Sequence, residues 1–237
     1  MTKIVYTPII DGEKSVFIYK SNIFESDFID EIKGFLEKQD YKDGHCVSGR
    51  EIPRKQIWYQ KQGKYFCSDW KQRYDRWVAQ PSYPKLLDLI SEKIYQDKDI
   101  KKTLESHSIQ YPNINSCLIN KYRDGNDSIR AHRDTHLSFG PNPVIIGLSI
   151  GESRILRVRR LHNPNVFKSL KVEKSSDENI DFVLEENSIF VMAGYSQIYF
   201  SHEIPKMEDK GTRYSLTFRE FIDKSNDNKS NYNKLNI

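Results

Sequence analysis

The second half of the chain is divided into short apolar or alternating segments that are separated by turn residues. This pattern limits the possible fold more than any other feature of the sequence. Strands of this length and spacing are typical of a β-sandwich or a jelly-roll. The segments predicted to form strands are 115–122, 144–150, 154–160, 181–184, 188–192, 198–200 and 214–218.

The first half of the chain is expected to contribute helices around one short strand. Residues 16–19 form an apolar run that suits a strand. A helix is predicted from Ser26 to about residue 39, because apolar side chains recur there at helical spacing. A second helix is predicted from Pro84 to about residue 95, since proline is favoured at a first helical position.

These patterns predict an α+β protein that is mainly β with flanking helices. We expect residues 1–106 to form an N-terminal extension with the helices and a lid at about 42–68, and residues 107–222 to form the β core. Residues 223–237 have almost nothing to bury and are expected to be a disordered tail.

One tripeptide, His132-Arg133-Asp134, has the spacing of a metal site, and His202 follows much later in the chain. Residues two apart point to opposite sides of a helix but share a face on a strand, so a joint site requires extended chain here. Two histidines and one carboxylate can occupy one face of an octahedral metal, as in non-heme Fe(II) oxygenases. Alone, such a tripeptide is more often a pair of surface polar residues.

Two arginines in the last predicted strand strengthen the metal interpretation. Arg213 and Arg219 are six residues apart and share a face with Ser215 and Thr217. Six residues of strand span about 20 Å, so two arginines leaning inward could hold the ends of a small dicarboxylate through bidentate pairing. The alternative is a charged strand face with surface ion pairs.

Residues 42–68 are polar and irregular, yet they are rich in aromatic and basic side chains, including Arg54, Trp58, Tyr65 and Phe66. Aromatic faces interleaved with cations suit nucleic acid. The alternative is a hairpin whose aromatic residues pack on the core.

A net charge of +4 favours a polyanionic partner only weakly. The arginines of 154–160 could line a phosphate track or form a solvated strand edge.

Cysteine usage and hydropathy indicate the setting of the protein. The three cysteines are widely spaced and form no Cys-x-x-Cys pair, which argues against a disulfide framework or zinc ribbon and for a reducing environment. Neither a signal peptide nor a membrane span is evident. We expect a soluble, monomeric, intracellular protein of the nucleus or cytoplasm, with no membrane association.

Taken together, the separated motifs resemble those of AlkB-type Fe(II)/2-oxoglutarate dioxygenases. The segment 213–219 is nearly the family's signature, and Pro53-Arg54-Lys55-Gln56 is similar to a run in the nucleotide-recognition region of the animal DNA-repair members. The resemblance covers roughly residues 50–221. The residues that carry it are Asn120, Tyr122, His132, Asp134, His202, Arg213 and Arg219.

The resemblance implies a double-stranded β-helix (jelly-roll) core that uses Fe(II), 2-oxoglutarate and O2. Fe(II) would be held by His132, Asp134 and His202. 2-Oxoglutarate would be bound by Asn120, Tyr122, Arg213, Ser215 and Arg219, with Arg213 on the carboxylate farther from the metal. The substrate base would be bound by Arg54, Trp58, Tyr65, Phe66 and His136.

The implied reaction is oxidative demethylation of N-alkylated bases, of the 1-methyladenine and 3-methylcytosine type, in DNA or RNA. Formaldehyde, succinate and CO2 would be released. Repair members usually have an acidic residue directly after the metal aspartate, whereas Thr135 and His136 follow here. His45, Cys46 and Val47 stand where duplex-specialised members have an aromatic finger, which favours single strands.

Two alternatives belong to other functional classes. The same iron chemistry could act on a protein or lipid, although the aromatic and basic lid argues against this. The second alternative is a catalytically inactive nucleic-acid-binding module. The complete set of possible metal ligands and both arginines, Arg213 and Arg219, argue against it.

Overall fold

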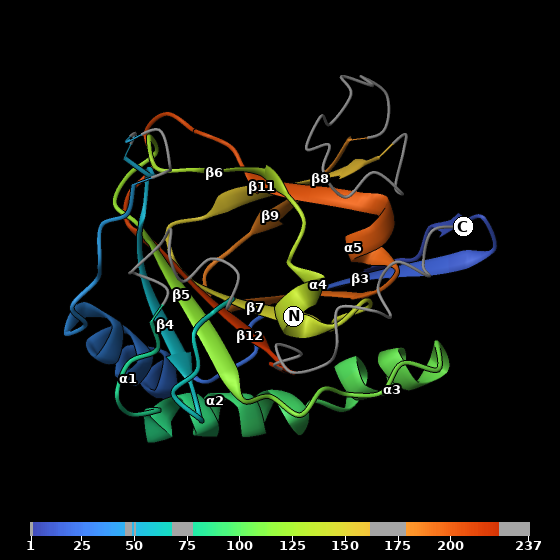
Figure 1. The fold of residues 1–237 in the computed structure, drawn as a ribbon, viewed down its shortest axis with the longest axis horizontal. Coiled ribbons are helices and arrows are strands. Elements are labelled where there is room, and N and C mark those ends of the chain that lie inside the picture. Colours follow the sequence, from blue (N-terminus) through green and yellow to red (C-terminus); the bar gives the residue numbers. More distant parts are fainter. Residues whose placement is uncertain (1, 46–48, 50, 68–77, 162–178, 223–237) are drawn as a thin grey trace.

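Two β-sheets form the core of the protein. A computed structural model describes residues 2–45, 49, 51–67, 78–161 and 179–222 (Figure 1). The strands are β1 (Lys3–Tyr6), β2 (Ile9–Ile10), β3 (Glu13–Ser21), β4 (Lys55–Gln60), β5 (Ser116–Tyr122), β6 (Ile129–His132), β7 (Ile145–Gly151), β8 (Arg154–Arg160), β9 (Asn179–Leu184), β10 (Ser188–Gly194), β11 (Phe200–Ile204) and β12 (Arg213–Arg219). The helices are α1 (Ser26–Glu37), α2 (Lys85–Tyr95), α3 (Lys98–Ser106), α4 (His136–Phe139) and α5 (Ser196–Tyr199).

The two sheets are antiparallel and differ in size. The larger sheet has the order β1-β3-β10-β7-β12-β5-β4, with β2 paired to β3, and the smaller has the order β6-β11-β8-β9. The three long helices lie below the larger sheet in Figure 1, and the smaller sheet lies above it. The mainly β class and the jelly-roll core predicted from the sequence are confirmed.

Side chains of the larger sheet point alternately into two hydrophobic layers. In β3, Val16 and Ile18 join the cluster that includes the helices, whereas Phe17 and Tyr19 join the cluster between the sheets. Because successive residues of a strand face opposite sides, one strand serves both layers. This explains why β3 is buried from Ser15 onward on both faces.

The two predicted helices are confirmed, whereas α3, α4 and α5 were not predicted. α1 begins at Ser26 as expected, and Pro84 directly precedes α2. α3 escaped the periodicity argument because few of its positions are apolar. Its start is marked instead by Asp97, whose carboxylate accepts hydrogen bonds from the backbone N–H groups of Asp99 and Ile100.

One strand prediction was wrong in part. Residues 198–200 were expected to be extended, but Ile198 and Tyr199 belong to α5, and β11 begins only at Phe200. The amides of Ile198 and Tyr199 both donate to the carbonyl of Tyr195, which closes a helical turn. A short apolar run fits a helix turn as well as a strand, so the pattern could not decide.

The expected boundary at residue 106 does not separate two folded units. Within the segment 1–106, β3 pairs with β10 and β4 pairs with β5, so this segment completes the larger sheet. The expected lid at 42–68 is also not irregular throughout, because it contains β4. The predicted tail, 223–237, lies outside the described residues.

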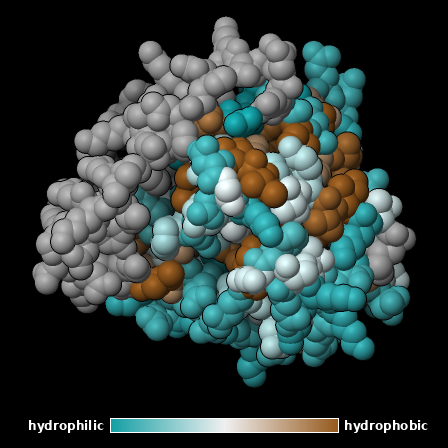
Figure 2. Space-filling view, turned by 90° about the vertical axis from the view of Figure 1, so that its right-hand side faces the viewer, coloured by the Kyte–Doolittle hydropathy of each residue, from teal (hydrophilic) through white to brown (hydrophobic). Residues whose placement is uncertain are grey.

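The N-terminal edge of the larger sheet exposes several large apolar side chains. β1 ends the strand order, and its neighbourhood exposes Ile4, Val5, Tyr6 and Ile9. Apolar residues gather on the face that is turned toward the viewer in Figure 2.

In the part of the chain that the structure describes, no helix is long and apolar enough to cross a membrane. The monomeric state stays a prediction.

Candidate active site

His132 and His202 are direct cross-strand neighbours in the smaller sheet. β6 and β11 pair antiparallel with His202 opposite His132, so both imidazoles leave the sheet on one face. Their ring centroids lie 4.2 Å apart, with 50° between the ring planes. Strand pairing thus joins two histidines that are distant in the sequence.

Asp134 completes a compact group of possible metal ligands. Its Oδ1 lies 3.9 Å from Nε2 of His132 and 3.9 Å from Nε2 of His202. The ligand atoms of all three residues lie within 4.8 Å of one another. Small side-chain adjustments would let one ion bind all three, and the donor set of two imidazoles and a carboxylate suits Fe(II).

Hydrogen bonds to a backbone carbonyl and to a glutamine side chain orient His132 and Asp134. Nδ1 of His132 lies 2.8 Å from the carbonyl oxygen of Arg130. Because a carbonyl only accepts, the neutral imidazole carries its proton on Nδ1 and keeps the Nε2 lone pair for a metal. The backbone N–H of Asp134 donates to Oε1 of Gln197 at 2.9 Å, which holds the chain just after β6.

The surroundings of His132, Asp134 and His202 favour the protonation states that can bind a metal ion. Burial lowers the pKa of His132 and lowers the pKa of His202 to about 3. Burial would raise the pKa of Asp134, but the positive charge of Arg219 and its hydrogen bond to the carboxylate outweigh this effect and lower the pKa. Neutral imidazoles beside an ionised carboxylate are the forms that bind a cation.

Arg213 is a buried cation with unused donors. Its side chain is 1% exposed, and Nη2 donates to Oγ of Ser149 at 2.9 Å. Nε and Nη1 are buried and have no hydrogen-bond partner among the described residues. The guanidinium also lies 5.2 Å from the ring centroid of Tyr122. A buried arginine in this state fits a carboxylate ligand, which would supply both the acceptors and the opposite charge.

A cavity of about 690 Å³ is lined by both Arg213 and the three possible metal ligands. It exists because facing positions on two central strands carry small side chains. Gly147 and Ser149 of β7 lie opposite Thr217 and Ser215 of β12, respectively. Alternation sends these side chains between the sheets, where they leave space beside the large apolar residues of that layer.

The predicted cosubstrate residues gather around this cavity. Its lining includes Asn120, Tyr122, Arg213, Ser215 and Arg219. Ser149 and Gln197 were not predicted as site residues. Ser149 could have been found as a polar position in an otherwise apolar predicted strand, whereas nothing local in the sequence marks Gln197.

The predicted base-binding residues separate into two groups. Arg54 and Phe66 line the cavity, whereas Trp58, Tyr65 and His136 are not part of its lining. Thr135 lines the cavity instead of His136, which begins the short helix α4. Cys46 and Val47, at the positions of the aromatic finger, lie outside the described residues.

Trp58 occupies a core position. Its side chain is 1% exposed, and Nε1 donates to the carbonyl of Lys64 at 3.0 Å. Its ring packs edge-to-face against Phe66, with 4.8 Å between centroids. This placement favours the alternative in which the tryptophan packs on the core, so we no longer assign it to base stacking.

The arginines of β8 do not form a free positive track. Arg154 is fully buried. Arg157 pairs with Asp181 at 2.7 Å, and Arg159 pairs with Glu203 at 2.6 Å. Alternation along the strand places Arg154 inside and pairs Arg157 and Arg159 with acidic residues of the same sheet, so we assign no phosphate contacts to these three arginines.

Sequence comparison places these features in a known family. The sequence model of the 2OG-Fe(II) oxygenase superfamily matches residues 17–219. The chain is 34% identical over 110 residues to mouse (Mus musculus) alpha-ketoglutarate-dependent dioxygenase alkB homolog 3, covering 44% of this chain and 36% of that protein. It is 32% identical over 116 residues to the DNA oxidative demethylase ALKBH2 of Arabidopsis thaliana, covering 44% and 37%. The match therefore spans little more than a third of these relatives.

Structural comparison agrees at the level of the fold. The solved structure of OsALKBH1 has a TM-score of 0.59 and 14% identity, covering 91% of this chain and 100% of that one. The superfamily match takes in the smaller sheet, most of the larger sheet and all three possible metal ligands, and leaves out β1 and β2. The protein thus belongs to the 2OG-Fe(II) oxygenase superfamily, and its relatives place it among the AlkB-type members.

Proposed function

We propose that this protein is an oxidative demethylase of N-alkylated bases in DNA or RNA. The single observation that carries the proposal is a shared cavity. It is lined by the ligand triad, by Arg213 with its unused donors, and by Arg54 and Phe66 from the segment that resembles a nucleotide-recognition region. The printed names of the relatives, an alkB homolog and a DNA oxidative demethylase, support the same substrate class.

The triad would hold the iron. His132, Asp134 and His202 present the two imidazoles and one carboxylate that leave half of an octahedral metal open for cosubstrates. With 2-oxoglutarate and O2, bound iron supplies the oxidising power that hydroxylates an N-methyl group. The hydroxymethyl group then leaves the base as formaldehyde, and 2-oxoglutarate leaves as succinate and CO2.

The cosubstrate would lie between Arg213 and the triad. Arg213 would pair with the carboxylate farther from the metal, supported by Tyr122, whose ring already contacts the guanidinium. Ser215, directly opposite Asn120 across β12 and β5, would contribute a hydroxyl from the same wall. Arg219 would lie at the metal end, because it contacts Asp134. These residues bind and orient the cosubstrate and exclude water.

The remaining cavity would receive the base. Ligand pockets commonly enclose about 300–1,000 Å³, and a cavity of about 690 Å³ has room for a small dicarboxylate and one planar ring. A base inside a duplex is out of reach, so it must be flipped, which is easiest for unpaired or single-stranded bases. The methylated rings carry positive charge, which favours stacking on Phe66. We therefore propose that single strands are preferred.

The test is a panel of oligonucleotides that carry 1-methyladenine or 3-methylcytosine, in single-stranded and duplex DNA and RNA. Each is incubated with the protein, Fe(II), ascorbate, 2-oxoglutarate and air, and mass spectrometry follows the loss of one methyl group. We expect demethylation, fastest in single strands, with formaldehyde in equal amounts. If 2-oxoglutarate is consumed but no methylated oligonucleotide is altered, the nucleic-acid proposal is wrong and a protein or lipid substrate gains support.

A further inference from the structure

Two side chains of the β4 region donate to a single oxygen atom, Oδ1 of Asn120. Nε of Arg54 lies 3.0 Å from this oxygen, and Nε2 of Gln56 lies 2.7 Å from it. Gln56 sits directly opposite Asn120 in the pairing of β4 with β5. The exposed fractions are 9% for Arg54, 2% for Gln56 and 5% for Asn120, so water competes little for these bonds.

The guanidinium determines how the asparagine amide is oriented. The oxygen and nitrogen of an amide exchange places when the group turns by half a circle, and hydrogen bonds decide which orientation holds. Arg54 has only donors, so it requires the oxygen of Asn120 on its side. Gln56 must then also donate. Asn120 lines the cavity. Because its Oδ1 accepts hydrogen bonds from Arg54 and Gln56, the polar group that it has left for a ligand is the Nδ2 amide.

We propose that Arg54 is a positioning residue for 2-oxoglutarate, which acts by holding Asn120 with its amide N–H groups toward the cosubstrate. A carboxylate accepts hydrogen bonds and repels a carbonyl oxygen, so the opposite orientation of Asn120 would weaken binding. Arg54 lies in the segment that resembles a nucleotide-recognition run, and this inference gives it a role at the other ligand. It rests on 2-oxoglutarate as the cosubstrate and not on the identity of the substrate.

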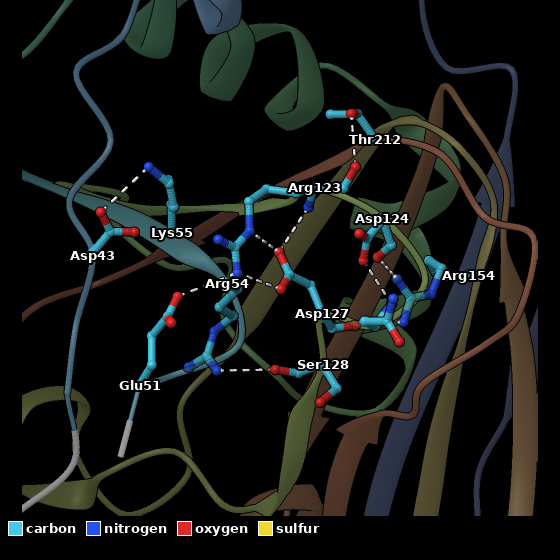
Figure 3. A network of polar contacts seen from close by, with 11 residues as sticks. Asp43, Glu51, Arg54, Lys55, Arg123, Asp124, Asp127, Ser128, Arg154 and Thr212 are labelled. Carbon is cyan, nitrogen blue, oxygen red and sulfur yellow. Dashed lines mark hydrogen bonds and ion pairs between the residues drawn. The ribbon is translucent and has the colours of Figure 1, made fainter. Parts of the chain in front are cut away.

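Arg54 is itself fixed in place by the loop between β5 and β6. Its Nη1 donates to the carbonyl of Ser128 at 3.2 Å, and the N–H of Ser128 donates to the carbonyl of Pro53 at 2.8 Å. The same loop is closed by Asp127, which accepts hydrogen bonds from Arg123 (Figure 3). A guanidinium anchored at both ends can impose its geometry on Asn120 with little loss of conformational entropy.

The test measures binding without turnover. Protein loaded with Mn(II) in place of Fe(II) is titrated with 2-oxoglutarate under nitrogen by calorimetry. Arg54→Met should raise the dissociation constant at least about tenfold, which corresponds to about 1.4 kcal/mol. Arg54→Lys keeps an obligate donor and should stay within about threefold of the parent. Gln56→Leu should also have a small effect, because Arg54 still sets the amide.

A double-mutant cycle separates positioning from the charge of Arg54 itself. If Arg54 acts through Asn120, Arg54→Met should cause no further loss of affinity in a protein that already carries Asn120→Ala. Additive losses in the cycle would overturn the inference. Arg157→Met, which removes a surface arginine of β8, is the matched control for affinity and for urea-induced unfolding.

Failure of this inference differs from failure of the proposed function. If Arg54→Met binds 2-oxoglutarate like the parent but demethylates oligonucleotides slowly, Arg54 serves the base, and the inference is wrong. If the predicted binding pattern is found while no methylated oligonucleotide is a substrate, the inference stands and the nucleic-acid proposal fails.

Discussion

Nε of Arg219 lies 2.5 Å from Oδ2 of Asp134, and both side chains are only 5% exposed. The guanidinium at the end of β12 thus occupies one oxygen of the carboxylate. The other oxygen, Oδ1, is left facing Nε2 of His132 and of His202. The pairing therefore leaves one oxygen of Asp134, Oδ1, for the proposed metal, and it links the proposed metal site to β12, which carries the arginines proposed to bind 2-oxoglutarate.

Asp134→Asn should weaken metal binding at least about tenfold, a loss typical of disturbed metal sites. The substitution keeps an acceptor for Arg219 and so preserves the local packing, but it removes the anionic ligand of the triad. Mn(II) titration followed by electron paramagnetic resonance measures the change. Asp181→Asn, at a surface ion pair, is the control. Parental metal affinity in Asp134→Asn would contradict the assigned site.

Arg213→Lys should weaken 2-oxoglutarate binding by more than tenfold. An ammonium cannot reproduce the two-pronged contact of a guanidinium, and a hydrogen bond to a charged group contributes about 1.5–3 kcal/mol. Calorimetry on the Mn(II)-loaded protein gives the dissociation constant, with Arg157→Lys as the control. An unchanged constant would mean that the unused donors of Arg213 serve another ligand.

Phe66→Leu should impair demethylation of a methylated oligonucleotide more than it impairs 2-oxoglutarate consumption without substrate. Phe66 lines the cavity and also packs on Trp58, so leucine keeps an apolar side chain while it removes the stacking face. Both rates are measured on the same preparation by mass spectrometry. Equal losses of the two rates would remove Phe66 from base binding.

Asp127→Asn should lower the free energy of unfolding at pH 7 by about 1–3 kcal/mol, because hydrogen bonds to charged groups are lost. Asp127 is 3% exposed and accepts hydrogen bonds from the Arg123 backbone and side chain. Burial alone would raise the pKa of Asp127, but its bonds to Arg123 lower it.

The same carboxylate predicts the pH dependence of stability. A lowered pKa in the folded state stabilises the protein above the unfolded value of about 3.9, and the effect is lost as the pH falls through the folded value. The difference in unfolding free energy between the parent and Asp127→Asn should therefore shrink below about pH 4. Urea unfolding at a series of pH values tests this, and a difference that grows in acid would contradict it.

Local patterns in the sequence were sufficient to predict the class of fold and the kinds of ligand, a metal ion and a carboxylate. Alternating and apolar runs identified most core strands, because burial of one or both faces leaves a signature within a few residues. His132, Asp134 and Arg213 could be selected because their types and spacing suit a metal and a carboxylate. None of these inferences needed knowledge of which strands are neighbours.

Tertiary structure decided which of these residues meet. β6 pairs with β11, which sets His132 opposite His202, and β4 pairs with β5, which gives Asn120 its two donors. It also buried Trp58 and turned residues 198–199 into a helix turn. Strand pairing and burial depend on contacts between segments far apart in the chain. A single residue's local sequence is compatible with either outcome, so only the packed structure could choose.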